Sequence, residues 1–279
     1  MASQSKLHLF LSSWSTRLAL AMIVIVVLMA FLAPWLASQD PMFLDPSVRL
    51  KKPSAAHILG TDAYGRDLYS RIIYGSRVSL MVGTGVLAIS VFFGVILGAL
   101  AGYFRALDSV IMRIMDGIMA IPAVLLAIAL VSVSGASLTT VIVAIAVPEI
   151  PRVTRLVRSI MLSVRSEPYV EAAVTLGTSP LKILLRHMLP NTVAPLIVQG
   201  TYIFAAAVLI EAILSFLGAG IPPEVPSWGN IIADGRSYFQ LLPGLVLYPG
   251  IVLSLTILTI NMLGDAARDA LDPKLAARN

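Results

Sequence analysis

The sequence predicts an all-α polytopic membrane protein with about six transmembrane helices, a cytoplasmic helix–Gly–helix segment and both termini in the cytoplasm. Hydrophobic residues make up 58% of the 279 residues and charged residues only 13%, about half of their share in soluble domains. Long charge-free runs recur along the chain, and about 20 mostly apolar residues suffice to cross a bilayer. Lys and Arg gather in alternate connecting segments, as they do in cytoplasmic loops.

The charge-free runs give the expected spans. We interpret the first run as a retained membrane anchor, because a secretory h-region is usually only about 7–15 residues long; a cleaved signal peptide is the alternative. The run 117–148 is too long for one span, and the turn-prone Ser134-Gly135-Ala136-Ser137 divides it into two helices. Five spans is the alternative count. The expected spans are 18–39, 78–104, 110–133, 138–157, 187–223 and 237–264.

Basic residues set the orientation. If the N-terminus lies inside, the inside segments hold 13 of the 20 Lys and Arg residues, which favours both termini inside. This topology accounts for the net charge of +5, so no nucleic-acid partner is expected. The expected order is a cytoplasmic tail at 1–17, the anchor at 18–39, a periplasmic loop at 40–77, a transmembrane region at 78–265 that includes the cytoplasmic segment 166–191, and a second cytoplasmic tail at 266–279.

The cytoplasmic segment 166–191 is predicted to form two short helices separated by a glycine. Pro168 suits the first turn of a helix, where its missing N–H leaves nothing unpaired. Gly177 suits the left-handed position just past a helix end. Ser179-Pro180 can start the second helix, and Pro190 is expected to end it. The spacing predicts an apolar stripe on this second helix, made of Leu181, Leu184, Leu185, Met188 and Leu189.

This helix pair has two possible roles at the membrane surface. Ala172 and Ala173 keep one turn of the first helix slim, which suits insertion into a cleft of a partner protein. The alternative is an interfacial amphipathic helix that touches only lipid headgroups. That alternative explains the leucines but gives no reason for the Ala–Ala turn or for Gly177.

Small residues form one face of the second expected span. Because glycine and serine allow another helix to approach closely, we expect this face to pack within the chain, with a subunit interface as the alternative. The face consists of Ser90, Gly94, Gly98 and Gly102.

Charged residues near the spans are candidate functional groups. Glu211 is the one acid well inside an apolar run, and intramembrane carboxylates usually face a bundle interior or a cavity. Glu211 is therefore a candidate to line a path, and a buried structural acid is the alternative. Arg152, Arg155 and Arg158 are expected to extend to the inner headgroups, with contact to a cytoplasmic partner as the alternative.

The segment 166–191 resembles the cytoplasmic signature of bacterial ABC importer permeases. That signature reads Glu-Ala-Ala, three residues, Gly, nine residues, then an apolar residue, any residue and Leu-Pro. His187 stands where the signature has an apolar residue, but the peptide and nickel branch of the family tends to read Arg-His-Ile-Leu-Pro-Asn there, and 186–191 is similar. The matching residues are Glu171, Ala172, Ala173, Gly177, Leu189 and Pro190.

Four further stretches resemble the same branch and are distributed along the chain after residue 55. The first of them points to the second permease of a pair, the subunit that has an outside segment before its second span. The stretches are 57–80, 108–130, 211–232 and 261–275.

The resemblance implies a permease subunit of the bacterial inner (cytoplasmic) membrane that forms half of a translocation path for di- or oligopeptides. It implies a heterodimer with a homologous permease, two ATP-binding subunits, a periplasmic or extracellular solute-binding protein, and surrounding lipid. The segment 166–191 would dock on the ATP-binding subunits and couple their movement to the spans. No lysine follows a glycine, so a phosphate-binding Gly-x-x-x-x-Gly-Lys loop is missing. ATP and Mg²⁺ are therefore expected on the partners, with no cofactor in this chain.

Other functions stay open at this point. A nickel or metal-chelate permease of the same branch would share these motifs. An intramembrane enzyme would need convergent catalytic groups, and the spans offer only Glu211 and Asn261, so we expect no catalytic residue and no enzyme. A stand-alone channel would not need a docking segment. The chain has no cysteine and three histidines without metal-ligand spacing, so no metal site is expected.

Overall fold

The computed structural model describes residues 13–271, so the outermost parts of both predicted tails lie outside the described residues. Helices dominate this part of the chain. The apolar segments are helical because a helix pairs its own backbone N–H and C=O groups, which lipid cannot do. The α-helices are α2 (Trp14–Phe31), α3 (Ala33–Leu36), α4 (Leu68–Tyr103), α5 (Arg105–Met119), α6 (Ala123–Ser134), α7 (Leu138–Arg165), α8 (Pro168–Thr175), α9 (Pro180–Ile183), α10 (Val193–Phe216), α11 (Trp228–Gly235) and α12 (Gly244–Leu271). A π-helix, Leu184–Met188, and 3-10 turns at Pro46–Val48, Leu189–Thr192 and Arg236–Tyr238 complete the helical elements.

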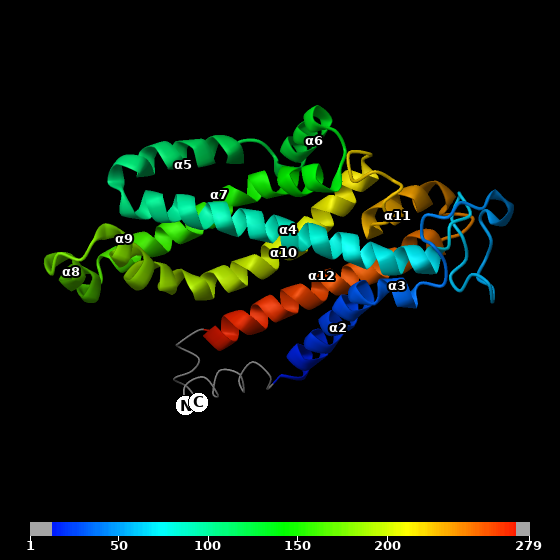
Figure 1. The fold of residues 1–279 in the computed structure, drawn as a ribbon, viewed down its shortest axis with the longest axis horizontal. Coiled ribbons are helices and arrows are strands. Elements are labelled where there is room, and N and C mark those ends of the chain that lie inside the picture. Colours follow the sequence, from blue (N-terminus) through cyan, green and yellow to red (C-terminus); the bar gives the residue numbers. More distant parts are fainter. Residues whose placement is uncertain (1–12, 272–279) are drawn as a thin grey trace.

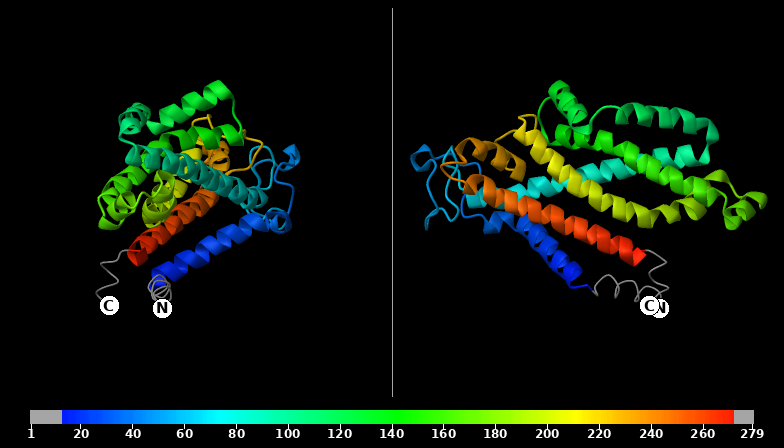
Figure 2. Two further views of the ribbon diagram at one scale, coloured as in Figure 1. Left: turned by 60° about the vertical axis from the view of Figure 1, so that its left-hand side comes forward. Right: turned by 180° about the vertical axis from the view of Figure 1, so that it is seen from behind.

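The long helices run along the length of the molecule, with different short elements at its two ends (Figure 1). α8 and α9 lie at one end, whereas α11 and the loop before α4 lie at the other (Figures 1 and 2). α5 and α6 cover one side of the α4–α7 pair, and α2 lies on the opposite side beside α12 (Figure 1). The main core lies between α4, α7 and α10, around Val82, Ile145 and Leu214.

The predicted class, an all-helical polytopic membrane protein, is confirmed. Within the described residues, four helical runs are long and apolar enough to cross a membrane: α2, α4, Pro180–Phe216 and α12. The pair α5 and α6 adds a fifth if it is counted as one broken span. α7 has 28 residues but carries Glu149 and four arginines, and it is not among these runs.

Two predicted helix boundaries are wrong. The helix expected over 110–133 is broken between Met119 and Ala123, where α5 and α6 meet at 87°, because Pro122 has no N–H to continue the α5 ladder. α4 begins at Leu68 instead of 78, and Asp67 caps it by accepting a hydrogen bond from the Ser70 N–H at 2.9 Å.

The small-residue face of α4 packs on α7 within the chain. A Cβ added to Gly98 would lie 2.7 Å from the Thr154 carbonyl oxygen, so the two backbones approach too closely for any side chain there. The hydroxyl of Ser90 donates to the Ala146 carbonyl at 3.3 Å. Gly94 and Gly102 also face α7, against Val153 and Met161. All four small residues are buried.

Candidate functional site

The first helix of the predicted docking segment ends as its sequence indicates. Pro168 is the first residue of α8, and Gly177 has φ +72°, the left-handed conformation that glycine adopts without strain. The Gly177 N–H donates to the Val174 carbonyl at 2.9 Å, and the Thr178 N–H donates to the Ala173 carbonyl at 3.1 Å. This pair of bonds is a Schellman cap, which fixes the direction in which the chain leaves a helix.

The second helix does not end at Pro190, contrary to the prediction. The chain passes from α9 through the π-helix and a 3-10 turn directly into α10. Pro190 provides no N–H, and the next residue adds side-chain bonds here: Asn191 Nδ2 donates to the carbonyls of His187 at 2.8 Å and Met188 at 3.2 Å. The Tyr169 hydroxyl also contacts the His187 carbonyl, at 3.4 Å, and ties α8 to the π-helix. π-Helical turns are frequent at functional sites.

The six signature residues do not share one surface. Glu171, Ala172, Gly177 and Pro190 are exposed, Leu189 is half-buried, and Ala173 is buried. Ala173 packs into this chain's own core cluster, so the idea that both alanines form the docking turn is corrected: only Ala172 is available on the outer side.

The apolar stripe of the second helix is also divided. Met188 is buried and Leu184 packs against the core, whereas Leu181 and Leu185 are exposed. Ile183, which lies outside the predicted stripe, takes a buried place. The stripe prediction assumed an undistorted α-helix, and the π-helix changes which side chains point inward.

The exposed apolar side chains of this segment were predicted only in part: Leu181 and Leu185 belong to the expected stripe, whereas Val174 and Leu176 were not singled out. Leu176 is 84% exposed, and Val174, Leu181 and Leu185 are exposed as well. Clusters of exposed apolar residues mark interaction sites when they lie outside lipid. The signal was present, because Val174 and Leu176 fall off the face of α8 that contains Val170 and Ala173. This exposed set, with Glu171 and Ala172, is called the outer face of the segment below.

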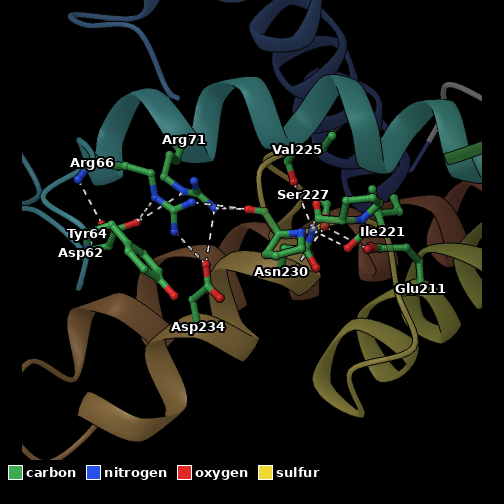
Figure 3. Close-up of polar contacts among 12 residues, drawn as sticks. Asp62, Tyr64, Arg66, Arg71, Glu211, Ile221, Val225, Ser227, Asn230 and Asp234 are labelled. Atoms are coloured by element: carbon green, nitrogen blue, oxygen red, sulfur yellow. Dashed lines mark hydrogen bonds and ion pairs between the residues drawn. The ribbon is translucent and has the colours of Figure 1, made fainter. Parts of the chain in front are cut away.

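Glu211 lies near the opposite end of the molecule and is fully buried. Its Oε1 accepts hydrogen bonds from the hydroxyls of Ser215 and Ser227, both at 2.8 Å (Figure 3). Ser227 also caps α11 by accepting from the Asn230 N–H at 3.0 Å. This enclosure does not support the path-lining interpretation, and it agrees with the structural alternative.

A buried ion-pair network joins three segments at the same end (Figure 3). The Arg66 guanidinium donates to Asp62 at 2.6 Å and to Asp234 of α11 at 2.8 Å. Arg71 of α4 is fully buried and lies 3.7 Å and 3.6 Å from the same two carboxylates. Buried charges require such pairing. The network was not foreseen, because its members are up to 172 residues apart and no local motif connects them.

The arginines of α7 do not behave alike. Arg155 donates to Asp116 at 2.6 Å, and Arg158 makes two bonds to Asp108, one of them at 2.6 Å. Both acids belong to α5, so the headgroup interpretation is wrong for these two residues. Arg152 instead contacts Glu149 on its own helix. Among residues 13–271, no group of three or more His, Asp or Glu side chains is placed to hold a metal ion.

Comparison with known families agrees with the signature. Residues 90–277 match the family described as binding-protein-dependent transport system inner membrane component. Residues 7–53 match the N-terminal TM domain of oligopeptide transport permease C.

Curated relatives cover nearly all of the chain. A probable peptide ABC transporter permease protein of Sinorhizobium fredii is 49% identical over 90% of this chain and 86% of its own length. The dipeptide transport system permease protein DppC of Alkalihalophilus pseudofirmus is 44% identical over 93% of this chain and 86% of its own. A solved structure of the MetNI methionine ABC transporter, in an inward-facing conformation, covers 72% of this chain and 97% of its own, with a TM-score of 0.57 and 18% identity. That likeness shows the fold alone.

Membership in a binding-protein-dependent system implies an ATPase and a binding protein as partners. The family match covers most of the chain and the relatives are well above 30% identity, so the family inferred from the signature is confirmed. The chain belongs to the inner-membrane permease components of binding-protein-dependent ABC transport systems, as a multi-pass subunit that is not itself the ATPase.

Proposed function

We propose that this chain is the second permease of a di- or oligopeptide importer and forms half of its translocation path. The other half would come from a homologous permease in a heterodimer. Two ATP-binding subunits would hold ATP and Mg²⁺, and a solute-binding protein would deliver the cargo from outside. The names of the relatives favour peptide over nickel, and the match to the oligopeptide permease C domain favours the second position of the pair.

The proposed topology has six spans: α2, α4, the bent pair α5–α6, α7, α10 and α12. α7 would cross despite its charges, because Asp108 and Asp116 neutralise two of its arginines. α8 and α9 would lie in the cytoplasm and α11 in the periplasm. The start of α2 and the end of α12 both point toward the end that carries α8 and α9 (Figure 1), which supports cytoplasmic termini.

The observation that carries the coupling role is the outer face of the segment 166–191. Its apolar side chains are exposed, and the segment lies at one end of the molecule (Figure 1). Val170 and Ala173, in contrast, fix α8 to the core. A segment that is anchored on one side and apolar on the other suits a groove on a second protein. In the assembled importer we place the ATP-binding subunits there.

Substitution of Gly177 tests this role. A Cβ at Gly177 meets nothing within 4 Å, so Gly177→Asp adds a charge at the docking surface with only local backbone strain. We expect the assembled, reconstituted importer to lose roughly tenfold or more of its ATP-driven dipeptide uptake, equivalent to about 1.4 kcal/mol or more of lost coupling. Binding of the ATPase subunits should weaken in pull-down.

Gly218 provides a matched control at the other end of the molecule. It has φ +81°, nothing within 4 Å of an added Cβ, and the same pair of capping bonds, from Gly218 N–H to Ser215 and from Ala219 N–H to Leu214. Gly218→Asp should retain uptake. The coupling role is contradicted if Gly177→Asp transports as well as Gly218→Asp does.

A further inference from the structure

Arg152 differs from the two arginines that follow it on α7. Arg155 and Arg158 bond to acids of α5. The Nη1 of Arg152 lies 3.2 Å from Oε1 of Glu149 and donates to its Oε2 at 3.3 Å. Glu149 is fully buried, whereas the Arg152 side chain is 53% exposed. Within residues 13–271, Arg152 makes no other hydrogen bond, so Nε and Nη2 stay available.

The packing of α7 on α4 gives the depth of Arg152 in the membrane. Val153, the next residue, packs against Gly94 of α4. Gly94 lies nine residues before the last residue of α4, Tyr103, which is about 14 Å along the helix. It lies within a charge-free run of α4, beside the exposed apolar Phe92 and Phe93. In the proposed topology, Arg152 therefore lies in the inner half of a hydrocarbon core that is about 30 Å thick.

A half-exposed guanidinium at this depth cannot face lipid tails at an acceptable free energy. Charged side chains inside a membrane face a water-filled cavity or pair with another group. Glu149 satisfies only one end of the guanidinium. The exposed part of Arg152 therefore faces either the aqueous path of the importer or the partner permease.

A neighbouring cleft favours the aqueous path. It has a volume of about 510 Å³ and is lined by α7, α10 and α12, with Leu156, Gln199, Tyr202 and Arg268 among its residues. Leu156 is four residues after Arg152, so both lie on one face of α7. A cleft of this size lies within the usual range of small-molecule sites, and its glutamine, tyrosine and arginine make it partly polar.

We propose that Arg152, oriented by Glu149, binds the terminal carboxylate of the peptide as it enters this cleft. This rests on the proposed peptide transport. Every linear peptide has that carboxylate whatever its sequence, so one fixed cation can serve many cargoes. A guanidinium with two free N–H directions matches a carboxylate in geometry and charge. Glu149 is a positioning residue, because it holds Nη1 and leaves the rest of the fork exposed.

The test compares a dipeptide with its C-terminal amide. The complete importer, with its binding protein, is reconstituted in proteoliposomes, and uptake of both compounds is measured for the wild type, Arg152→Gln, Glu149→Gln and Arg155→Gln. The readout is the uptake of the free acid divided by that of the amide. A structural role would change both rates together and leave this ratio constant.

We expect Arg152→Gln to lower the ratio roughly tenfold, as the loss of a charge-assisted hydrogen bond would, and Glu149→Gln to lower it less. Arg155→Gln should keep the wild-type ratio. An unchanged ratio in Arg152→Gln overturns the proposal; if both rates fall equally, Arg152 pairs with the partner permease instead. Absence of wild-type peptide uptake would contradict peptide transport itself, and so the two failures are distinguishable.

A second measurement uses the unaltered importer and does not depend on the folding of a variant. A dipeptide with a photoreactive diazirine on its C-terminal residue is crosslinked during ATP-driven uptake, and the adducts are mapped by mass spectrometry. We expect labelled residues on α7 near Arg152 and Leu156, and on α10 near Gln199. Labelling confined to other helices overturns the proposal.

Discussion

At the scale of single residues, Glu211 shows how an intramembrane acid can be structural. One carboxylate oxygen accepts hydrogen bonds from the hydroxyls of two serines. One of them, Ser227, also accepts from the Asn230 N–H at the start of α11. Glu211→Gln keeps an acceptor oxygen in place, so stability and dipeptide uptake should stay near wild type. Glu211→Ala removes the acceptor and should destabilise the protein by about 1–3 kcal/mol, measured as a lower thermal midpoint in detergent. A stable Gln variant that no longer transports would instead show a direct role in the path.

The conformation of Gly177 could be predicted from sequence because helix caps depend on a few adjacent residues. The burial of Ala173 could not, since it depends on the core beneath α8. The same limit applies to Glu149. It lies inside the expected fourth span, 138–157, but its burial and its contact with Arg152 depend on how α7 packs against the neighbouring helices.

At the scale of elements, the α4–α7 contact depends on missing side chains. Gly98→Ala would place a Cβ 2.7 Å from the Thr154 carbonyl oxygen, and the helices would have to separate. Overpacking of this kind typically destabilises by about 1–3 kcal/mol. Gly117 of α5 is a control within another helix, because an added Cβ meets nothing within 4 Å. Gly117→Ala should be neutral or stabilising by up to about 1 kcal/mol. Equal thermal midpoints for the two variants would contradict the tight contact.

Two elements show why helix limits were harder to predict than helix existence. The early start of α4 was hidden by Arg71 and Arg77, which seemed to exclude residues before 78 from a span. The structure neutralises Arg71 with acids from the outer loop and from α11, which a local reading cannot anticipate. The break before α6, in contrast, was marked by Pro122, and the apolar composition around it concealed the signal.

At the scale of the whole molecule, Asp62 helps to connect the outer loop to α4 and α11. It is buried, and it pairs with Arg66 and Arg71. Asp62→Asn would leave two buried arginines with one carboxylate between them, and breaking such a pair destabilises by about 3–5 kcal/mol. We expect faster hydrogen exchange in residues 48–67 and in α11, with α8 unaffected. The exposed Asp269 is the control, and Asp269→Asn should leave exchange unchanged. An equal increase in the exchange rate across all helices of Asp62→Asn would contradict a local role for the network.

The passage from α9 into α10 has a mechanical consequence. Pro180–Phe216 is one helical run of 37 residues, about 55 Å long, with the exposed Leu181 near one end and the Glu211–Ser227 contact near the other. No loop separates these two points. A turning force applied to the docking segment would therefore reach the outer end as torsion of a single rod, and the wider π turn at Leu184–Met188 is the place where that rod can wind or unwind.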